Sequence, residues 1–347
     1  MPRAFPAAPE AEHPALDDLH IVSNDLTSRQ GFTAVSILRN EIYFLPAFLA
    51  HYRALGVGRF VVIDDQSADG SRANLAAQPD VMVLGSARRY GDRIEAPADG
   101  RVQWSADFRV GLLWRQYLLD TFGRDSWSLL LDLDEFIHLP EGVRFPDLAR
   151  RLDPAEGEVV WSPLIDCYPA SPADLAAAGG TDFDPATGWF IDGWPHLAHT
   201  SADKPRVRYA GVRARLMLQH GLVQTKSLKQ RIWWHVLGRP PIFNAVGKMT
   251  LQYWRAGDRF VGVHHTVKPA RTDTLLPIQH FKFTGALYAK LDWAIQSGAY
   301  YGGSKEYKLM ADLLSRMQAE GSGFTDARSV AVTGYDSFAR TGNARGL

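Results

Sequence analysis

Hydrophobic and polar positions follow one another in blocks over the first third of the chain, in an order that predicts strand, helix and strand. Three short runs are rich in apolar residues, as in strands that are buried on both faces of a sheet. Between the first two runs, apolar residues in 42–55 recur with the spacing of an amphipathic helix, which ends before Gly56. This order predicts a parallel sheet with right-handed crossovers. The expected strands are 33–38, 59–63 and 81–84.

A helix expected over 103–122 leads into a stretch in which an apolar run is followed directly by three carboxylates. The apolar run Trp127–Leu131 reads as a buried strand and passes directly into Asp132, Asp134 and Glu135. In an extended chain Asp132 and Asp134 share one face about 7 Å apart, where two carboxylates repel by roughly 2.4 kcal/mol at an effective dielectric near 20. A divalent cation removes this cost, and oxygen ligands suit Mg²⁺ or Mn²⁺. The alternative is a solvated strand end or a helix cap.

The second half of the chain has shorter and more varied segments. Residues 169–205 are rich in Pro, Gly, Asp and Ala and predict a long irregular excursion, of the kind that forms a lid or an acceptor surface. Regular elements are expected before and after it. The predicted strands are 159–165, 212–218, 247–253, 260–265 and 279–283, and the predicted helices are 286–295 and 305–317.

Polar clusters follow three of the predicted strands of the first half, at Arg39–Glu41, Asp64–Asp69 and Asp132–Glu135. In open α/β sheets ligands bind beyond the carboxyl ends of the strands, so we expect these clusters to converge on one crevice. The second cluster could be only a turn, since Asp, Ser and Gly are turn formers. Alternatively its carboxylates accept hydrogen bonds from a nucleobase or ribose, and Glu41 carries the same ambiguity.

Candidate ligands also lie on the later strands. His280 and Lys282 share a face of the strand predicted over 279–283. A neutral imidazole beside Asp132 and Asp134 would complete a three-ligand site, and Lys282 could meet a phosphate. A strand histidine alone is more often a structural residue.

Basic residues on two other predicted strands could also either bind a ligand or be ordinary charged residues. Arg213 and Arg215 would share a strand face, an arrangement that suits a pyrophosphate, although solvated strand charges are commoner. Lys248 lies between two apolar strand halves.

Composition narrows the partners and the compartment. Lys plus Arg and Asp plus Glu number 38 each, which argues against a nucleic acid held by bulk charge. The single cysteine, Cys167, excludes an internal disulfide and fits a reducing compartment. No apolar run approaches the roughly 20 residues that span a bilayer, and no signal peptide is evident. We therefore expect a cytoplasmic protein, with peripheral association at the inner face of a membrane left open.

The same patterns indicate how the chain is divided. Residues 1–30 alternate Pro, Ala and acidic residues and predict a loose leader, ordered only where Leu16, Leu19, Ile21 and Val22 can pack. Residues 31–320 predict a single domain with two halves, 31–145 and 146–320. Residues 321–347 are small and polar and predict a tail.

Taken together, these motifs resemble the family 2-type glycosyltransferases of the GT-A fold. The resemblance rests on Arg39-Asn40-Glu41 after the first strand, Asp-Asp-x-Ser-x-Asp-Gly at 64–70 and Asp-x-Asp-Glu-Phe at 132–136. More narrowly, the chain is similar to a bacterial branch related to the plant and animal family 92 enzymes, from about Thr33 to Tyr300. The motifs of the later half are Gly211–Arg215, Gly247–Met249, Val263–His265 and Gln279–Phe283.

The resemblance implies a GT-A-like fold, in which a mainly parallel twisted sheet is flanked by helices and a smaller mixed or antiparallel sheet lies in the C-terminal half. It implies a nucleotide-sugar donor, a UDP-sugar in the first instance, whose diphosphate is bound through Mn²⁺ or Mg²⁺. Asp134 would be the principal metal ligand, Asp132 would serve the ribose or the metal, and His280 would be the third ligand. The nucleoside would be held by Glu41, Asp64 and Asp65, and Asn40 would also bind substrate. Residues 31–145 would then be the nucleotide-binding half of a catalytic domain, and residues 146–320 its acceptor or closing half.

The resemblance also implies transfer with inversion to a glycan or lipid-linked acceptor, in surface polysaccharide assembly. Inversion needs a carboxylate on the acceptor side to take the hydroxyl proton, and the alternative candidates are Asp166 and Asp192. A nucleotidyltransferase on a similar sheet is a second hypothesis, but it expects a Gly-rich loop where this chain has Arg39–Glu41. A non-catalytic nucleotide or glycan binder is the third.

Overall fold

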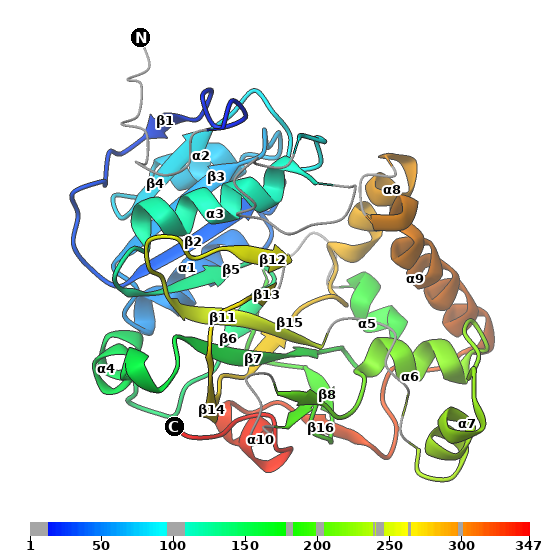
Figure 1. Ribbon diagram of the computed structural model, residues 1–347. Coiled ribbons are helices and arrows are strands. Elements are labelled where there is room, and N and C mark those ends of the chain that lie inside the picture. Colours follow the sequence, from blue (N-terminus) through cyan, green and yellow to red (C-terminus); the bar gives the residue numbers. More distant parts are fainter. Residues whose placement is uncertain are drawn as a thin grey trace. The chain divides into compact units, whose positions relative to one another are not determined.

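In the computed structural model the chain divides into two compact units (Figure 1). Unit 1 contains residues 1–133, 141–161 and 248–272, and unit 2 contains residues 134–140, 162–247 and 273–347. The structure describes residues 13–95, 108–177, 183–198, 205–238, 240, 246–262, 265–297 and 301–347.

Unit 1 is built on a mixed sheet in which most neighbouring strands are parallel. The strand order is β1-β4-β3-β2-β5-β11. The inner pairs β4–β3, β3–β2 and β2–β5 are parallel, and β1 and β11 join antiparallel to β4 and β5. The strands predicted in the first half are therefore confirmed. Their bounds are β1 His20–Ser23, β2 Thr33–Leu38, β3 Arg59–Asp64, β4 Val81–Gly85, β5 Trp127–Leu131 and β11 Gly247–Tyr253.

Helices cover both faces of this sheet because its strands are apolar on both sides. Helix α3 (Val110–Phe122) packs on the face that carries Val61 and Leu130. Helix α1 (Leu45–Ala54) packs on the other face, where the ring of Phe48 lies 6.4 Å from that of Phe60. The remaining elements of unit 1 are α2 Ser71–Ala76, α4 Phe145–Arg151, the short 3₁₀ helix Pro154–Glu156 and the paired strands β12 Phe260–Gly262 and β13 His265–Thr266.

The helix boundaries differ in detail from the sequence predictions, whereas the leader is ordered where its apolar residues were expected to pack. Helix α1 begins at Leu45 rather than at residue 42, and α3 is described from Val110 onward because residues 96–107 lie outside the described part. Leu16 and Leu19 of the expected leader are buried in the core of unit 1, and β1 follows them. The described end of the leader is therefore an ordered part of unit 1.

Unit 2 contains a short sheet with the order β7-β15-β6. Strand β15 (Ile278–His280) runs parallel to β7 and antiparallel to β6. Strand β7 starts in unit 1 and continues into unit 2, and β14 also pairs with it. Two small antiparallel sheets accompany it, β8 with β16 and β9 with β10. The bounds are β6 Glu135–Ile137, β7 Val159–Asp166, β8 Phe190–Asp192, β9 Leu197–Ala198, β10 Arg206–Val207, β14 Ala270–Leu275 and β16 Ser329–Ala331.

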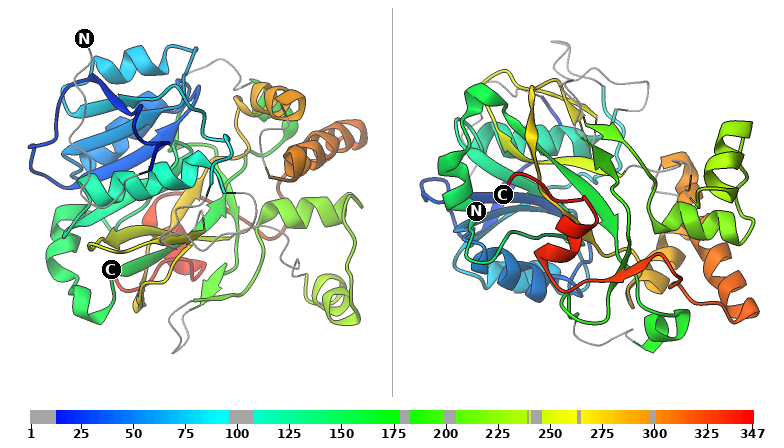
Figure 2. Two further views of the ribbon diagram at one scale, coloured as in Figure 1. Left: turned by 45° about the horizontal axis from the view of Figure 1, so that its top comes forward. Right: turned by 90° about the horizontal axis from the view of Figure 1, so that it is seen from below.

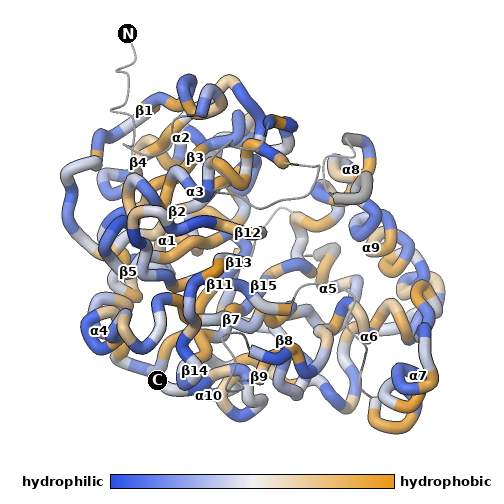
Figure 3. The backbone as a smooth tube through the Cα atoms, viewed as in Figure 1, coloured by the Kyte–Doolittle hydropathy of each residue, from blue (hydrophilic) through white to orange (hydrophobic). Residues whose placement is uncertain are grey.

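Helices of unit 2 surround a second core. Helices α8 and α9 lie side by side (Figures 1 and 2), and they enclose Phe283, Leu313 and Phe324 together with α6. Helix α7 lies apart from this core and carries strongly hydrophobic residues beside hydrophilic ones (Figure 3). The helices are α5 Pro172–Ala177, α6 Val212–Gln219, α7 Leu228–His235, α8 Leu287–Ser297, α9 Tyr301–Glu320 and α10 Tyr335–Arg340.

The prediction of a strand over 212–218 is wrong, because this segment is helix α6. The first five residues alternate apolar and charged side chains, which mimics the period of a half-buried strand. In the helix Arg213 and Arg215 point to different sides, and each is buried against its own carboxylates. Ion pairing therefore stabilises a helix whose sequence pattern favoured a strand.

At a coarser level the fold prediction is confirmed, since the chain is α/β with a large mixed sheet of mostly parallel strands, flanking helices and small antiparallel sheets. Strand β15 ends at His280, so only part of the strand expected over 279–283 forms. The expected tail contains β16 and α10, and Phe338 in α10 is buried. Among the described residues, no helix is both long and apolar enough to cross a bilayer.

The packing of the core of unit 1 can be tested by a substitution at Leu130. Leu130 is buried between β5 and α3, so Leu130→Ala should lower the free energy of unfolding by about 2 to 5 kcal/mol through lost burial and a cavity. Leu228→Ala is the matched control because Leu228 is exposed on α7 and should change the stability little. Urea unfolding of the three proteins measures the difference, and equal stability of the two variants would contradict this core.

Candidate functional site

In unit 1, the loops that follow β2 and β3 are cross-linked at the carboxyl edge of the sheet. The Asn40 side-chain oxygen accepts from the Ala68 N–H at 2.8 Å, and the Asn40 N–H donates to Ser67 Oγ at 2.9 Å. The N–H of Glu41 donates to Ser71 Oγ at 3.0 Å. Asn40 has a φ of +55°, a left-handed conformation that asparagine tolerates better than most residues. The two loops therefore hold each other in one conformation.

The structure supports the turn interpretation for part of the Asp64–Ser71 loop. The carboxylate of Asp69 accepts from the N–H groups of Ile42 and Ser71 at 2.9 Å each. The amide of Gln66 donates to three carbonyls, those of Ser86, Ala87 and Arg88. These polar side chains are bound to backbone groups, so their contacts explain the loop's shape.

The two leading aspartates of this loop are buried and engaged. Asp64 accepts from Arg72 Nε at 2.6 Å, and Asp65 accepts from the Tyr90 N–H at 3.2 Å. Arg39 lies 3.9 Å from the Asp65 carboxylate. Burial raises the pKa of Asp65, and the Tyr90 N–H and nearby arginines only partly oppose this. Asp65 is thus a carboxylate at the strand edge whose charge the surroundings do not fully stabilise.

Asp132, at the end of β5, is held by two buried cations. Arg115 on α3 donates to Oδ1 at 3.0 Å, and Lys248 on β11 donates to Oδ2 at 3.0 Å. The side chain of Asp132 is 35% exposed, whereas those of Arg115 and Lys248 are 5% and 1% exposed. Arg115 and Lys248 therefore compensate the charge of Asp132. The repulsion between Asp132 and Asp134 that the sequence suggested does not by itself require a metal ion at Asp132.

In unit 2, the strand register brings a second group of side chains together. His280 is opposite Asp166 of β7 and opposite Glu135 of β6, and Asp134 immediately precedes β6. His280 Nδ1 lies 2.7 Å from Asp166 Oδ1, and its Nε2 lies 3.8 Å from Asp134 Oδ1. Lys282 Nζ donates to Asp134 Oδ2 at 2.6 Å. The pairing of Asp134 with His280 was expected from the sequence.

The charges around Asp166 keep its carboxyl group ionised. Burial alone would raise the pKa of Asp166, but the Arg213 guanidinium at 2.6 Å, together with His280, holds it well below its ordinary value. The ionised Asp166 lies 2.7 Å from His280 Nδ1 and orients the ring, so that Nε2 is the nitrogen facing Asp134. A carboxylate that fixes the tautomer of a ligating histidine in this way is the usual second shell of a metal site.

The protein side chains of this cluster do not supply a complete set of metal ligands. Among the residues that the structure describes, no group of three or more His, Cys, Asp or Glu side chains is placed to hold one. Asp134 and His280 supply two suitable donors, and Mg²⁺ or Mn²⁺ commonly completes its shell with water and substrate phosphates. The two residues therefore fit an ion that arrives with a phosphate ligand. Asp132 belongs to unit 1, so the three-ligand set stays a prediction.

Lys282 and Arg213 are engaged by carboxylates of unit 2. Burial lowers the pKa of Lys282, but the Asp134 carboxylate more than offsets this and holds it above its ordinary value. Arg213 binds Asp166 and also contacts Glu306 on α9. The predicted pyrophosphate site at Arg213 and Arg215 assumed a shared strand face, and helix α6 removes that premise.

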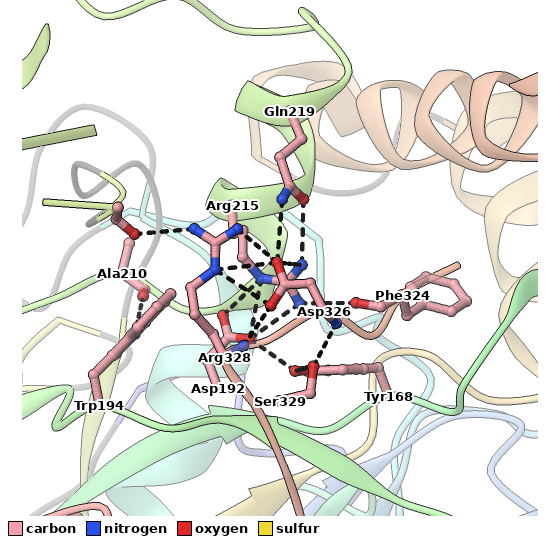
Figure 4. Close-up of polar contacts among 11 residues, drawn as sticks. Tyr168, Asp192, Trp194, Ala210, Arg215, Gln219, Phe324, Asp326, Arg328 and Ser329 are labelled. Carbon is pink, nitrogen blue, oxygen red and sulfur yellow. Dashed lines mark hydrogen bonds and ion pairs between the residues drawn. The ribbon is translucent and has the colours of Figure 1, made fainter. Parts of the chain in front are cut away.

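Asp192 lies in a separate buried network (Figure 4). Its Oδ1 accepts from the Tyr168 hydroxyl at 2.7 Å and from Arg215 Nε at 3.0 Å. Arg215 also donates to the Phe324 carbonyl at 2.9 Å and to Asp326 at 3.1 Å. Asp192 is 1% exposed, so this network explains the residue as a structural anchor.

Sequence reasoning gave no role to Arg115 or Glu306. Arg115 had a usable signal, because it is the one basic residue of α3, whose other residues are mostly apolar. Glu306 lies in an ordinary polar stretch of α9, and its contact with Arg213 spans 93 residues of sequence. No local pattern marks a contact of that range.

A comparison with models of known protein families finds no match for this chain, and a comparison with curated proteins also finds none.

The low pKa of Asp166 predicts a specific acid sensitivity. As pH falls below about 4, the unfolded chain binds a proton at this residue while the folded chain does not. The stabilisation is therefore present above about pH 4 and declines below it, by up to about 1.4 kcal/mol per pH unit from this group. Asp166→Asn should flatten the stability profile in that window, as measured by urea unfolding at a series of pH values.

Asp147→Asn provides the control, because it removes an equal charge from the exposed surface of α4. If Asp166→Asn kept the slope of the unchanged protein below pH 4, the Arg213–Asp166–His280 arrangement would not hold Asp166 ionised.

Proposed function

We propose that this protein is a metal-dependent glycosyltransferase that moves a sugar from a nucleotide-sugar donor to a glycan or lipid-linked acceptor. The observation that carries the proposal is the arrangement in unit 2, where Asp134 and His280 face each other at 3.8 Å. The opposite nitrogen of His280 is fixed by Asp166. A carboxylate and an oriented imidazole suit Mn²⁺ or Mg²⁺ with a diphosphate as the further ligand.

The polar edge of unit 1 supports the donor part of the proposal. The rigid loops at Asn40–Glu41 and Asp64–Asp65 lie beyond the carboxyl ends of parallel strands, the usual place for a nucleotide in an open α/β sheet. Asp65 keeps a raised pKa there, so its carboxyl gains from a donor such as a ribose hydroxyl or a base N–H. Asp132 and its two cations, Arg115 and Lys248, together add one net positive charge close to the same edge.

The proposal gives each residue a definite part. Asp134 and His280 would hold the ion, Asp166 would keep the imidazole in the ligating tautomer, and Lys282 would neutralise Asp134 and meet a donor phosphate. When bound, the ion would supply electrostatic stabilisation of the departing diphosphate, in place of a protonated acid.

No base is assigned to the acceptor hydroxyl. A base needs an accessible carboxylate whose pKa permits it to take a proton, and the pKa of Asp166 is held low by Arg213. Asp192 is enclosed by Tyr168 and Arg215. Among the two predicted candidates, Asp166 serves the proposal better as the partner of His280.

Ligand-induced thermal shifts test the metal and the donor together. A nucleoside diphosphate, UDP in the first instance, should stabilise the protein only when Mn²⁺ is present, by about 2.7 kcal/mol at a hundredfold excess over its Kd. Asp134→Asn and His280→Gln should each weaken the Mn²⁺-dependent binding at least about tenfold, because each removes one of two protein ligands. Differential scanning fluorimetry with UDP, GDP, CDP and dTDP measures the shifts.

Two matched substitutions serve as controls. Asp147→Asn removes an exposed carboxylate, and His220→Gln removes a histidine that pairs with Glu320. Both should keep the full Mn²⁺-dependent shift. The proposal fails if no diphosphate stabilises the protein with Mn²⁺, or if Asp134→Asn binds as tightly as the unchanged protein.

Product analysis separates transfer from binding. Incubation with a panel of nucleotide sugars and Mn²⁺ should release free sugar and nucleoside diphosphate from one donor, since water can replace a missing acceptor. Binding without any release would favour a non-catalytic binder. Formation of a nucleotide sugar from sugar phosphate and nucleoside triphosphate would favour a nucleotidyltransferase.

A further inference from the structure

Helix α7 of unit 2 displays apolar side chains to the surroundings. None of its eight residues is buried. The exposed fractions of Leu228 and Ile232 are 71% and 46%, and those of Val236 and Leu237, just after the helix, are 73% and 52%. An exposed cluster of this kind marks an interaction surface more often than isolated apolar residues do.

The helix is fastened to unit 2 by its opposite side. The guanidinium of Arg328 lies 5.7 Å from the ring centroid of Trp234, and its Nη1 donates to the Gly238 carbonyl at 3.2 Å. Arg328 is itself held by Asp326 at 2.6 Å. At the N-terminus, Ser227 Oγ accepts from the Gln230 N–H as an N-cap. These contacts fix the rotation of the helix about its axis.

With Trp234 against unit 2, the apolar residues form a stripe on the outer side. Successive residues turn by about 100° in an α-helix, so Ile232 lies about 160° around the axis from Trp234. Leu228 and Val236 are one turn to either side of Ile232, at the i, i+4 and i+8 positions that share a face. The outer face is therefore a continuous apolar stripe.

The flanks of this stripe are basic and aromatic. Lys226, Lys229 and Arg231 lie in or next to the helix, and the Lys229 ammonium is 5.0 Å from the ring centroid of Trp233. The sequence contains no Asp or Glu from Lys204 to Gly257. An apolar face with lysine, arginine and tryptophan beside it is the pattern of a helix that lies in a membrane interface.

We propose that α7 docks this protein on the surface of an anionic lipid bilayer. The stripe of Leu228, Ile232 and Val236 enters the boundary between headgroups and acyl chains, and the basic flanks meet the negative headgroups. The positive charge beside the stripe favours an anionic bilayer as the partner, because each lysine or arginine near an anionic leaflet strengthens the binding. An apolar protein partner would gain nothing from these lysines and arginines.

Vesicle co-sedimentation of the full-length chain tests the proposal without any nucleotide or metal, so its outcome does not depend on the proposed sugar transfer. The protein should bind vesicles of phosphatidylcholine with phosphatidylglycerol and bind pure phosphatidylcholine at least about tenfold more weakly. Ile232→Glu should lower binding to the mixed vesicles about tenfold or more, and Lys226→Gln with Lys229→Gln should lower it about tenfold or more.

Matched controls replace similar residues away from α7. Val267→Glu changes a side chain of unit 1 that is 68% exposed, and Lys305→Gln with Lys308→Gln removes two exposed lysines of α9. Both should bind as the unchanged protein does, and the exposure of Ile232 means that Ile232→Glu should keep the thermal stability.

Three results would overturn the proposal. The first is no binding to the mixed vesicles, and the second is equal binding to pure phosphatidylcholine. The third is sedimentation velocity showing a dimer that Ile232→Glu dissociates, which would make the stripe a contact between copies of this chain.

Discussion

Burial of charged side chains is the constraint on which this structure depends most. Asp166 and Arg213 are both buried, as are Asp192 and Arg215, and Lys248 is buried against Asp132. Removing one member of such a pair leaves a charge without compensation, at a cost of about 3 to 5 kcal/mol. The elements that carry these residues must therefore form together, and this requirement accounts for helix α6 more directly than its own sequence does.

Buried ion pairs also explain which parts of the fold could be predicted. The strands β2, β3, β4 and β5 followed from continuous apolar runs, because their stabilisation comes from burial that any apolar neighbour can provide. Helix α6 could not be predicted, since its arginines are satisfied by carboxylates more than 20 residues away in either direction. Local patterns carry no information about partners at that range.

The candidate site likewise contains features that the sequence predicts and features that depend on distant partners. The closeness of Asp134 and His280 could be expected from motif and strand pattern, while the engagement of Asp132 by Arg115 and Lys248 could not. The boundary between the two units falls between Leu133 and Asp134. The two aspartates of the Asp-x-Asp motif are thus supported by different cores and by different cations, so a change in one core need not disturb both.

The arrangement of segments along the chain has a consequence for the order of synthesis. The last segment of unit 1 ends at Thr272, so this unit can close while the ribosome is still adding the C-terminal helices. Unit 2 depends on residues 324–331, because Arg215 binds the Phe324 carbonyl and Asp326, and β8 pairs with β16. The nascent chain therefore carries an unfinished second unit until residues 324–331 have been synthesised.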